Sequence, residues 1–424
     1  MATLPLLLAL ALAQTAGRPQ VPASVLIFTL DDIANVDVST YGGPALTPTL
    51  DMLAAQGVRF LNHQASPTCA PTRRELLTGK FWWTGNGIAC ALPEANTPAA
   101  SEVLLPEAMP SYSSALLGKW HLGGAPSGGA WELAPIEHGF DFWLDGMPAN
   151  VTECGGTGYS NWLRVTASAT GHSSEISTQY SPAVTAVDFV QLWPTATEPR
   201  LAVVGINLAH APFHVPPPYA LPAGYPTPVT ARQKYEAMIV AYDRAIGSML
   251  SVVDMERTLV VVVSDNGTPP NVAGVDSSRA KGTTFRRGVN TPLIIAGACV
   301  VNPGRLSTAL VCPADVFATA VAVAGGGQAV DGVSLLPILQ DQAGFVAHDL
   351  VLCGNAWGSP DGDVAAVSLA YKLRRLDPDG DKAIDSEELY DLAADPGELV
   401  NEIQNPNLQS VAESMRAWLG ARLP

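Results

Sequence analysis

Basic residues are scarce in this chain of 424 residues. It has 23 lysines and arginines against 39 aspartates and glutamates, giving a formal net charge of −16, and it contains no basic block. Because proteins that bind nucleic acids neutralise phosphates with lysine and arginine, the composition argues against a nucleic-acid partner. Only 15% of the residues are charged and 47% are hydrophobic, so the chain can bury a large core.

Long hydrophobic runs and closely paired cysteines are also missing. Beyond the first residues no run is both long and apolar enough for a bilayer, so we expect no stable membrane span. None of the six cysteines belongs to a Cys-x-x-Cys pair, so we do not expect a zinc cage. The cysteines stand at positions 69, 90, 154, 299, 312 and 353.

The first residues are typical of a secretory signal. Residues 4–13 are apolar throughout, which is too short to cross a bilayer but suits the centre of a signal peptide. We therefore expect residues 1–16 to be a signal peptide and the protein to enter the secretory pathway, as a secreted, periplasmic or lysosome-like protein. Export permits disulfides, and Cys299 with Cys312 is the pair closest in sequence.

Strand and helix patterns alternate as far as residue 340. Strands are expected at residues 24–30, 201–208, 259–263 and 293–296, and helices at 47–55, 181–193, 230–253 and 313–324. This alternation predicts an α/β fold, with a large, mixed but mostly parallel sheet sandwiched by helices.

The pattern changes in the last part of the chain. Strands at residues 350–353, 364–376 and 389–391, with a helix at 408–419, predict a small antiparallel sheet plus a helix. We therefore expect a catalytic domain over residues 20–340 and a C-terminal subdomain over residues 341–424.

Two acidic pairs follow two of the predicted core strands. Asp31-Asp32 closes the first strand and Asp265-Asn266 closes the most apolar one. Ligand sites in α/β sheets gather at the carboxyl ends of strands, where these side chains would meet. Hard oxygen ligands of this kind suit Ca²⁺ or Mg²⁺. Each pair alone could simply cap the loop or helix that follows, but two pairs together favour a metal.

A cysteine stands at the start of a predicted short helix. The run is Cys69-Ala70-Pro71-Thr72-Arg73, in which free helix amides and a guanidinium lie near the thiol. Such groups form an anion site, so the run indicates a nucleophile placed against an anionic ester. The alternative is a small buried cysteine beside an ordinary helix start, because free cysteine is among the most buried residue types.

The few other basic residues fall in informative places. Lys119 and His121 alternate around a tryptophan after an apolar segment, His210 follows the strand that begins at residue 201, and Lys281 precedes the strand at 293–296. Each alone is an ordinary polar residue. Together with the acidic pairs and Cys69, they match transfer of a group that carries several negative oxygens, where catalysis is mainly positioning and charge neutralisation.

With these motifs in place, the chain resembles the type I sulfatases, the formylglycine-dependent members of the alkaline-phosphatase-like superfamily. The resemblance covers the chain from about residue 24 to its end, with the motifs in family order. The matching motifs are Asp31-Asp32, Cys69-Ala70-Pro71-Thr72-Arg73 with Leu77-Thr78-Gly79, Gly118-Lys119-Trp120-His121-Leu122-Gly123, His138-Gly139-Phe140-Asp141, His210-Ala211-Pro212, Ser264-Asp265-Asn266-Gly267, Lys281-Gly282, Asp331-Gly332-Val333-Ser334-Leu335 and Glu388-Leu389-Tyr390-Asp391-Leu392.

The resemblance implies a sulfuric ester hydrolase with a modified residue and a bound metal. A formylglycine-generating enzyme would oxidise Cys69 to formylglycine during maturation. Asp31, Asp32, Asp265 and Asn266, with the modified Cys69, would bind one divalent cation, Ca²⁺ rather than Mg²⁺. The substrate would be a small-molecule or glycan sulfate ester.

The resemblance also implies roles for the basic residues. One hydroxyl of the hydrated aldehyde would attack sulfur, and the alcohol would leave with a proton from the side of His210 and Lys281. His121 would accept a proton from the second hydroxyl as sulfate is released. Arg73 and Lys119 would hold the hydrate and the sulfate oxygens.

Two departures from the family pattern and three alternative functions stay open. Arg286-Arg287 replace a Tyr-Glu type of pair, and Thr72 replaces the commoner serine. A phosphate or phosphonate monoester hydrolase could use the same scaffold. So could a non-catalytic anion-binding relative with an unmodified Cys69. A thiol-dependent acyl hydrolase is a weaker alternative, because the acidic pairs would have no role in it.

A second cation loop is a further hypothesis. Oxygen-bearing side chains recur between Asp377 and Glu388 at the spacing of an EF-hand loop, but Lys382 stands where the sharp turn needs glycine. An acidic hairpin tip is the competing interpretation, and the strand-like flanks favour it.

Overall fold

The structure is a computed structural model that describes residues 23–84, 98, 101–274, 277–355, 362–377 and 384–423. The predicted signal peptide and Cys90 lie outside these residues. None of the described helices has the length and apolar character needed to cross a bilayer.

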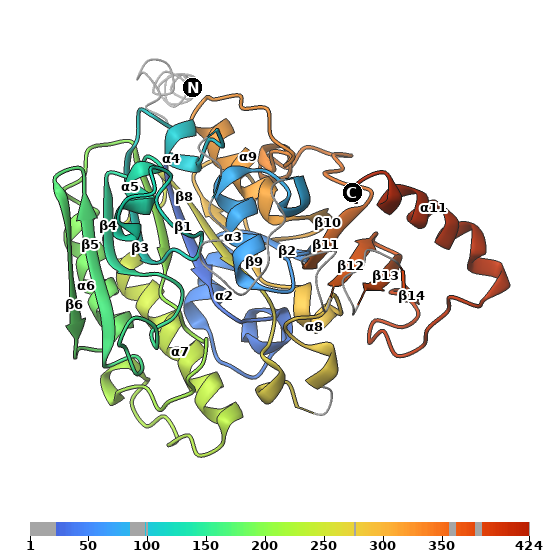
Figure 1. The fold of residues 1–424 in the computed structure, drawn as a ribbon, viewed down its shortest axis with the longest axis horizontal. Helices are drawn as coiled ribbons and strands as arrows, with labels where there is room; N and C mark the ends of the chain where they lie inside the picture. The colour runs from blue at the N-terminus through green and yellow to red at the C-terminus, as the bar shows by residue number, and fades with distance from the viewer. Residues whose placement is uncertain are drawn as a thin grey trace, which may run out of the picture.

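A ten-stranded sheet forms the centre of the molecule (Figure 1). Its strands are β1 (Ser24–Leu30), β2 (Gly57–His63), β3 (Ser113–Lys119), β4 (Phe142–Met147), β5 (Trp162–Ser168), β6 (Gly171–Ser177), β7 (Arg200–Gly205), β8 (Thr258–Ser264), β9 (Leu293–Gly297) and β10 (Arg305–Val311). Their spatial order is β10-β2-β9-β8-β1-β7-β3-β4-β5-β6. The central run from β8 through β1, β7 and β3 to β4 is parallel, whereas β9, β5 and β6 pair antiparallel with their neighbours. The predicted mixed, mostly parallel sheet is therefore confirmed.

Helices cover both faces of this sheet. The apolar side chains of α2 (Pro48–Ala55), α6 (Ser181–Leu192) and α7 (Ala231–Leu250) share one core with Leu26 and Phe28 of β1. Those of α3 (Cys69–Thr78), α4 (Leu105–Ala108) and α9 (Pro313–Val323) share the other core with Val25 and Ile27. Alternate residues of β1 thus point into opposite cores, which explains why this strand is apolar at nearly every position.

Local sequence signals fix several of these elements. Pro48 stands in the first turn of α2, and the Thr230 side chain accepts a hydrogen bond from Gln233 N at the start of α7. Both are common helix-start devices, because the first amides of a helix lack internal partners. The β-branched run in Thr258–Ser264 suits a strand that is buried on both faces.

A smaller antiparallel sheet follows in the C-terminal part of the chain, as predicted. It has the order β11 (Val351–Asn355), β12 (Gly362–Val367), β13 (Tyr371–Asp377) and β14 (Ser386–Asp391), and α11 (Gln409–Gly420) packs on it. Val351, Cys353 and Val367 also pack against Val289 and Leu310 of the larger unit. An apolar contact therefore joins the two sheets.

Two details of the sequence interpretation need adjustment, and a third is confirmed. The segment 364–376 forms two strands joined by a turn rather than one strand, and Cys299 is exposed whereas Cys312 is buried, so these two cysteines are not paired. β13 and β14 form a hairpin in which Leu376 pairs with Ser386. The flanks of the proposed cation loop are therefore strands, as the sequence predicts, while residues 378–383 lie outside the described part.

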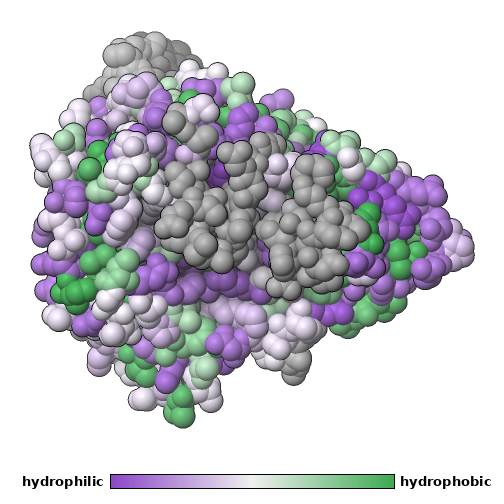
Figure 2. All heavy atoms as spheres, viewed as in Figure 1, coloured by the Kyte–Doolittle hydropathy of each residue, from purple (hydrophilic) through white to green (hydrophobic). Residues whose placement is uncertain are grey.

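The visible surface has mixed character. Figure 2 shows hydrophobic side chains in small groups among hydrophilic ones on the face that Figure 1 presents. Small apolar groups of this kind are normal on a folded chain and need no partner.

Candidate active site

The two acidic pairs meet at the carboxyl ends of β1 and β8. Because these strands pair in parallel with Leu30 opposite Ser264, the residues that follow them are neighbours. The backbone N–H of Asp32 donates to Asp265 Oδ1 over 3.3 Å, and Asn266 Nδ2 donates to Asp32 Oδ1 over 2.7 Å. All three side chains are buried. Parallel pairing of sequence-distant strands thus creates the acidic cluster.

Cys69 faces this cluster from the first residue of α3. Its Sγ lies 3.8 Å from Asp31 Oδ1 and 3.4 Å from Lys281 Nζ, and the residue is only 3% exposed. Thr68 precedes the helix in an extended conformation, and every residue of α3 is buried. The helix therefore presents its N-terminal end, with the thiol, to the ends of β1 and β8.

Three side-chain cations pair with the three carboxylates. Lys119 Nζ, at the end of β3, donates to Asp31 Oδ2 over 2.6 Å. Arg73 Nε donates to Asp265 Oδ2 over 3.0 Å, and its Nη2 lies 3.8 Å from Asp31 Oδ2.

The third cation, Lys281, contacts Asp32 Oδ1. Lys119 and Arg73 are buried, whereas the side chain of Lys281 is 18% exposed. Solvent therefore reaches the cluster on the Lys281 side.

The two predicted histidines occupy different positions. His210 Nε2 lies 3.9 Å from Asp32 Oδ2, and the side chain is 22% exposed. The Nδ1 of His121 is buried without a hydrogen-bond partner among the described residues. Burial and the positive charge of Lys119 hold the pKa of His121 well below its usual value, so this imidazole is neutral near pH 7.

Burial and neighbouring charges also set the protonation of the acidic groups. Burial opposes ionisation of Asp31, yet Lys119, His210 and Arg73 together hold its pKa well below the ordinary value. Burial, followed by the charge of Asp265, raises the pKa of Cys69 far above that of a free thiol. An unmodified Cys69 would therefore be a protonated thiol and a poor nucleophile.

The residues present fit a hard divalent cation. Ligand atoms of Asp31, Asp32, Cys69 and His210 all lie within 4.8 Å of one another. Asn266 Oδ1 is buried and has no hydrogen-bond partner among the described groups, although buried amide oxygens normally have one. A bound cation would satisfy this oxygen together with the carboxylates. Carboxylate and amide oxygens suit Ca²⁺.

The structure adds three residues to the site that the sequence interpretation missed. Asn207 Nδ2 donates to Asp31 Oδ2 over 3.0 Å. The hydroxyl of Tyr159 donates to the carbonyls of Asn207 and His210, and Asn150 Nδ2 lies 3.1 Å from His210 Nδ1. Asn207 follows β7 just as Asp31 follows β1, so its position at a strand end was the available signal.

Backbone strain gathers at the same strand ends. Asp32, His121 and Asn207 have φ values of 65°, 59° and 65°, in the left-handed region that residues with side chains seldom adopt. Strain of this kind persists where the surrounding structure enforces it, and it is concentrated at functional sites.

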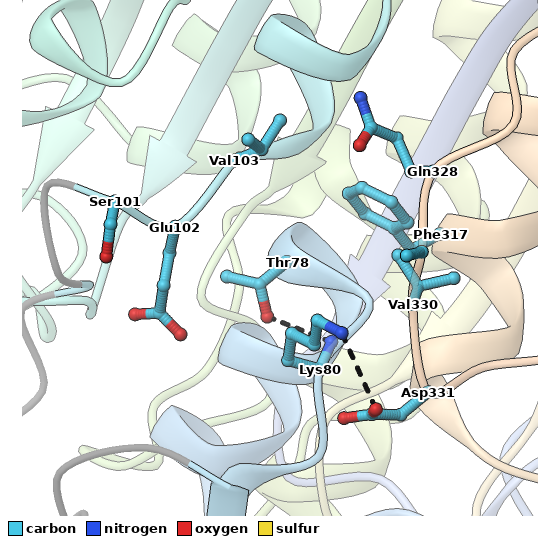
Figure 3. A pocket seen from close by; sticks show the side chains of 10 residues that line it. Thr78, Lys80, Ser101, Glu102, Val103, Phe317, Gln328, Val330 and Asp331 are labelled. Carbon is cyan, nitrogen blue, oxygen red and sulfur yellow. Dashed lines mark hydrogen bonds and ion pairs between the residues drawn. The ribbon is translucent and has the colours of Figure 1, made fainter.

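A cavity of about 370 Å³ lies elsewhere, at the opposite end of α3. Figure 3 shows Lys80 paired with Asp331 on its wall, near Phe317 of α9, and the ion-pair distance is 3.6 Å. Because α3 has ten residues, roughly 15 Å of helix separates this cavity from Cys69. The cavity is therefore not part of the candidate active site.

The fold and the site together define a hydrolase of anionic esters, with clustered carboxylates, cations and an N-terminal helix residue at the carboxyl ends of parallel strands. Comparison with known proteins gives the family: the sulfatase profile matches residues 23–326, and the chain belongs to the sulfatase family. It is accordingly a sulfuric ester hydrolase, as the sequence motifs predict.

Curated relatives agree with this assignment, and solved structures share the fold. N-acetylgalactosamine-6-sulfatase of Canis lupus familiaris is 29% identical over 365 residues, which cover 76% of this chain and 67% of the relative. Arylsulfatase A of Bos taurus is 27% identical over 92% of this chain and 86% of its own length. The crystal structure of Ps i-CgsB has a TM-score of 0.76 at 20% identity, covering 95% and 92% of the two chains. At 20% sequence identity, this similarity establishes a shared fold and no more.

Proposed function

We propose that the candidate active site cleaves sulfate monoesters through a formylglycine made from Cys69 and one bound Ca²⁺. The arrangement of Cys69 between the acidic strand ends and Lys281 carries this proposal. In the hydrated form, the aldehyde would supply a hydroxyl nucleophile and a second hydroxyl that lets sulfate depart. Plain thiolate attack would instead leave a thiosulfate ester with no easy exit.

Asp31, Asp32, Asp265 and Asn266 would hold the cation with the modified residue 69. Bound there, Ca²⁺ would neutralise charge on the nucleophile and on the sulfate oxygens. Because Arg73, Lys119 and Lys281 already balance the three carboxylates, a divalent cation would give the cluster an excess of positive charge. That excess is complementary to an anionic sulfate ester.

The remaining residues would orient groups and move protons. Arg73 and Lys119 would hold the modified residue and the sulfate oxygens from the buried side. Lys281 and His210 are partly exposed, so they would face the leaving alcohol and supply its proton. His121, neutral with an unpartnered Nδ1, could accept the proton that is lost when sulfate is released.

The proposed substrate is a sulfated sugar. Two relatives support this class: the N-acetylgalactosamine-6-sulfatase by its name, and a structural neighbour that was solved in complex with its substrate D-glucosamine-2-N,6-O-disulfate. We place the catalytic domain at residues 20–340 and the C-terminal subdomain at 341–424. Residues 1–16 would direct the chain to the secretory pathway, where a formylglycine-generating enzyme would act on Cys69.

Two measurements test the proposal. Mass spectrometry of the peptide that contains Cys69, from protein made in the native host, should show the mass of formylglycine. Turnover of an aryl sulfate should exceed that of the matching aryl phosphate and vanish in Cys69→Ala. A preference for phosphate would instead favour the phosphoesterase alternative. Unmodified Cys69 in an inactive protein would favour a role in anion binding alone.

A further inference from the structure

A second group of metal-ligating side chains lies outside the candidate active site. Cys312 immediately precedes α9, Asp315 lies in the first turn of that helix, and His348 belongs to the segment before β11. His348 Nε2 lies 2.9 Å and 3.1 Å from the two carboxylate oxygens of Asp315, and 4.0 Å from Cys312 Sγ. The three ligand atoms lie within 4.8 Å of one another. Two of the three side chains are buried, so this is an internal cluster.

The distances are close to those of a tetrahedral zinc site. With ordinary zinc bond lengths, the edges of such a tetrahedron are about 3.6 Å from sulfur to nitrogen and about 3.3 Å from nitrogen to oxygen. The cluster shows 4.0 Å and 2.9–3.1 Å for these edges. These two edges differ from the ideal values by about 0.2–0.4 Å, and the sulfur–oxygen edge is no longer than 4.8 Å.

The backbone fixes the Asp315 carboxylate at this place. Cys312 N donates to Asp315 Oδ2 over 2.9 Å, and Val333 N donates to Asp315 Oδ1 over 2.7 Å. Each carboxylate oxygen has further lone-pair sites, so these contacts orient the group without exhausting its capacity. Outer hydrogen bonds of this kind are typical of residues that ligate metals.

The same imidazole nitrogen faces both partners, which separates this cluster from a catalytic triad. In a triad, the histidine uses one ring nitrogen for the nucleophile and the other for the carboxylate. Here Nε2 of His348 faces both Cys312 and Asp315. Cys312 is only 2% exposed, so a substrate would have no access to its sulfur. The three ligand atoms therefore face one common point, as the ligands of a metal ion do.

We propose that Cys312, Asp315 and His348 form a binding site for Zn²⁺ with three protein ligands. The thiol of Cys312 would lose its proton to solvent as the sulfur–zinc bond forms, while Asp315 and His348 Nε2 supply oxygen and nitrogen. The His348 side chain is 13% exposed, and a water on that side completes the four ligands. The ion ties the start of α9 to the segment that leads into the small sheet. This set lacks a Cys-x-x-Cys pair, so the sequence spacing gave no signal of it.

Cobalt titration of the full chain tests this site. The protein is prepared with Cys69→Ala, which removes the other clustered thiol, and is kept in excess Ca²⁺. One equivalent of Co²⁺ should produce a thiolate-to-cobalt charge-transfer band, and Zn²⁺ should abolish it. Zn²⁺ should also raise the unfolding temperature, by roughly 2–5 °C at saturation.

Single substitutions test whether Cys312 and His348 bind the metal. Cys312→Ser should abolish the band, whereas Cys299→Ser and Cys154→Ser, at exposed cysteines, should leave it unchanged. His348→Ala should weaken zinc affinity at least about 10-fold and remove the thermal shift, and it gives a second test if Cys312→Ser does not fold. A band that survives Cys312→Ser, or the absence of any thiolate band, would overturn the proposal. So would a thermal shift that His348→Ala leaves intact.

Discussion

Lys119 Nζ lies 2.6 Å from Asp31 Oδ2, and neither side chain is more than 1% exposed. This pair is closed off from water, so each charge depends on groups inside the cluster. Removing one partner of a buried ion pair leaves the other without compensation, which is far more costly than losing an exposed pair.

We expect Lys119→Met to lower both turnover and stability. The free energy of unfolding should fall by about 3 kcal/mol, and kcat by roughly 100-fold or more. Lys372→Met is the matched control, because Lys372 is also buried and contacts Glu398 at 2.5 Å, far along the chain from the acidic strand ends. That control should lose stability but keep kcat. Equal losses of kcat in the two variants would contradict a specific role for Lys119.

Bound Ca²⁺ should stabilise the protein, and this effect should require Asp32. Adding Ca²⁺ back to metal-free protein should raise the unfolding temperature of the unsubstituted protein by about 2–5 °C. Asp32→Asn should lose this response, because one of the proposed ligands loses its charge. Asp254→Asn, at an exposed carboxylate, should respond as the unsubstituted protein does. Differential scanning calorimetry measures all three, and a normal calcium response in Asp32→Asn would contradict the assignment.

Glu75 should make stability depend on pH. Burial raises the pKa of this α3 residue from 4.5 to about 8 in the folded chain. The folded state therefore holds a proton that the unfolded state releases between these values. The stabilisation is complete below pH 4.5 and is lost as pH rises through 8, at up to about 1.4 kcal/mol per pH unit.

Glu75→Gln removes this titration, so its free energy of unfolding should decline less between pH 5 and pH 8 than that of the unsubstituted chain. Denaturant unfolding at several pH values measures the difference. Glu256→Gln, at an exposed residue, should leave the profile unchanged. Parallel profiles for the unsubstituted chain and Glu75→Gln would refute the prediction.

Asn207 should act by positioning Asp31. Asn207→Gly removes the side chain but tolerates the φ of 65°, so it tests the side-chain hydrogen bonds without adding backbone strain. These bonds are the one to Asp31 and two to the backbone of Ala149 and Val151. We expect kcat to fall about 10-fold, by analogy with outer partners of metal ligands. Asn207→Ala should lose about 1 kcal/mol more stability than Asn207→Gly, because alanine is strained at this backbone angle. Steady-state kinetics with unfolding curves separate the two effects, and an unchanged kcat in Asn207→Gly would exclude positioning.

Much of the fold was predictable because local patterns determine it. The run in β8 is apolar and β-branched, Pro48 begins α2, and the pairs Asp31-Asp32 and Asp265-Asn266 stand directly at strand ends. Patterns of this kind depend on residues a few positions apart, so they can be recognised in one sequence.

The parts that were missed depend on distant contacts. The strand-end position of Asn207 marks it as a candidate, but its contact with Asp31 depends on the pairing of β1 with β7, which the sequence does not show. The antiparallel direction of β9 is likewise fixed by β2 and β8 on either side of it. The distance between His348 and Asp315 also emerges only from tertiary packing.

The placement of β1 in the sheet has a consequence for biosynthesis. This strand emerges from the ribosome early, but its partners are β7, which begins at Arg200, and β8, which begins at Thr258. At ordinary translation speeds, the apolar residues of β1 would remain unpaired for roughly 10–40 s before β7 is synthesised. Until the later segments have been made, this apolar strand therefore lacks both of its sheet partners and is open to aggregation.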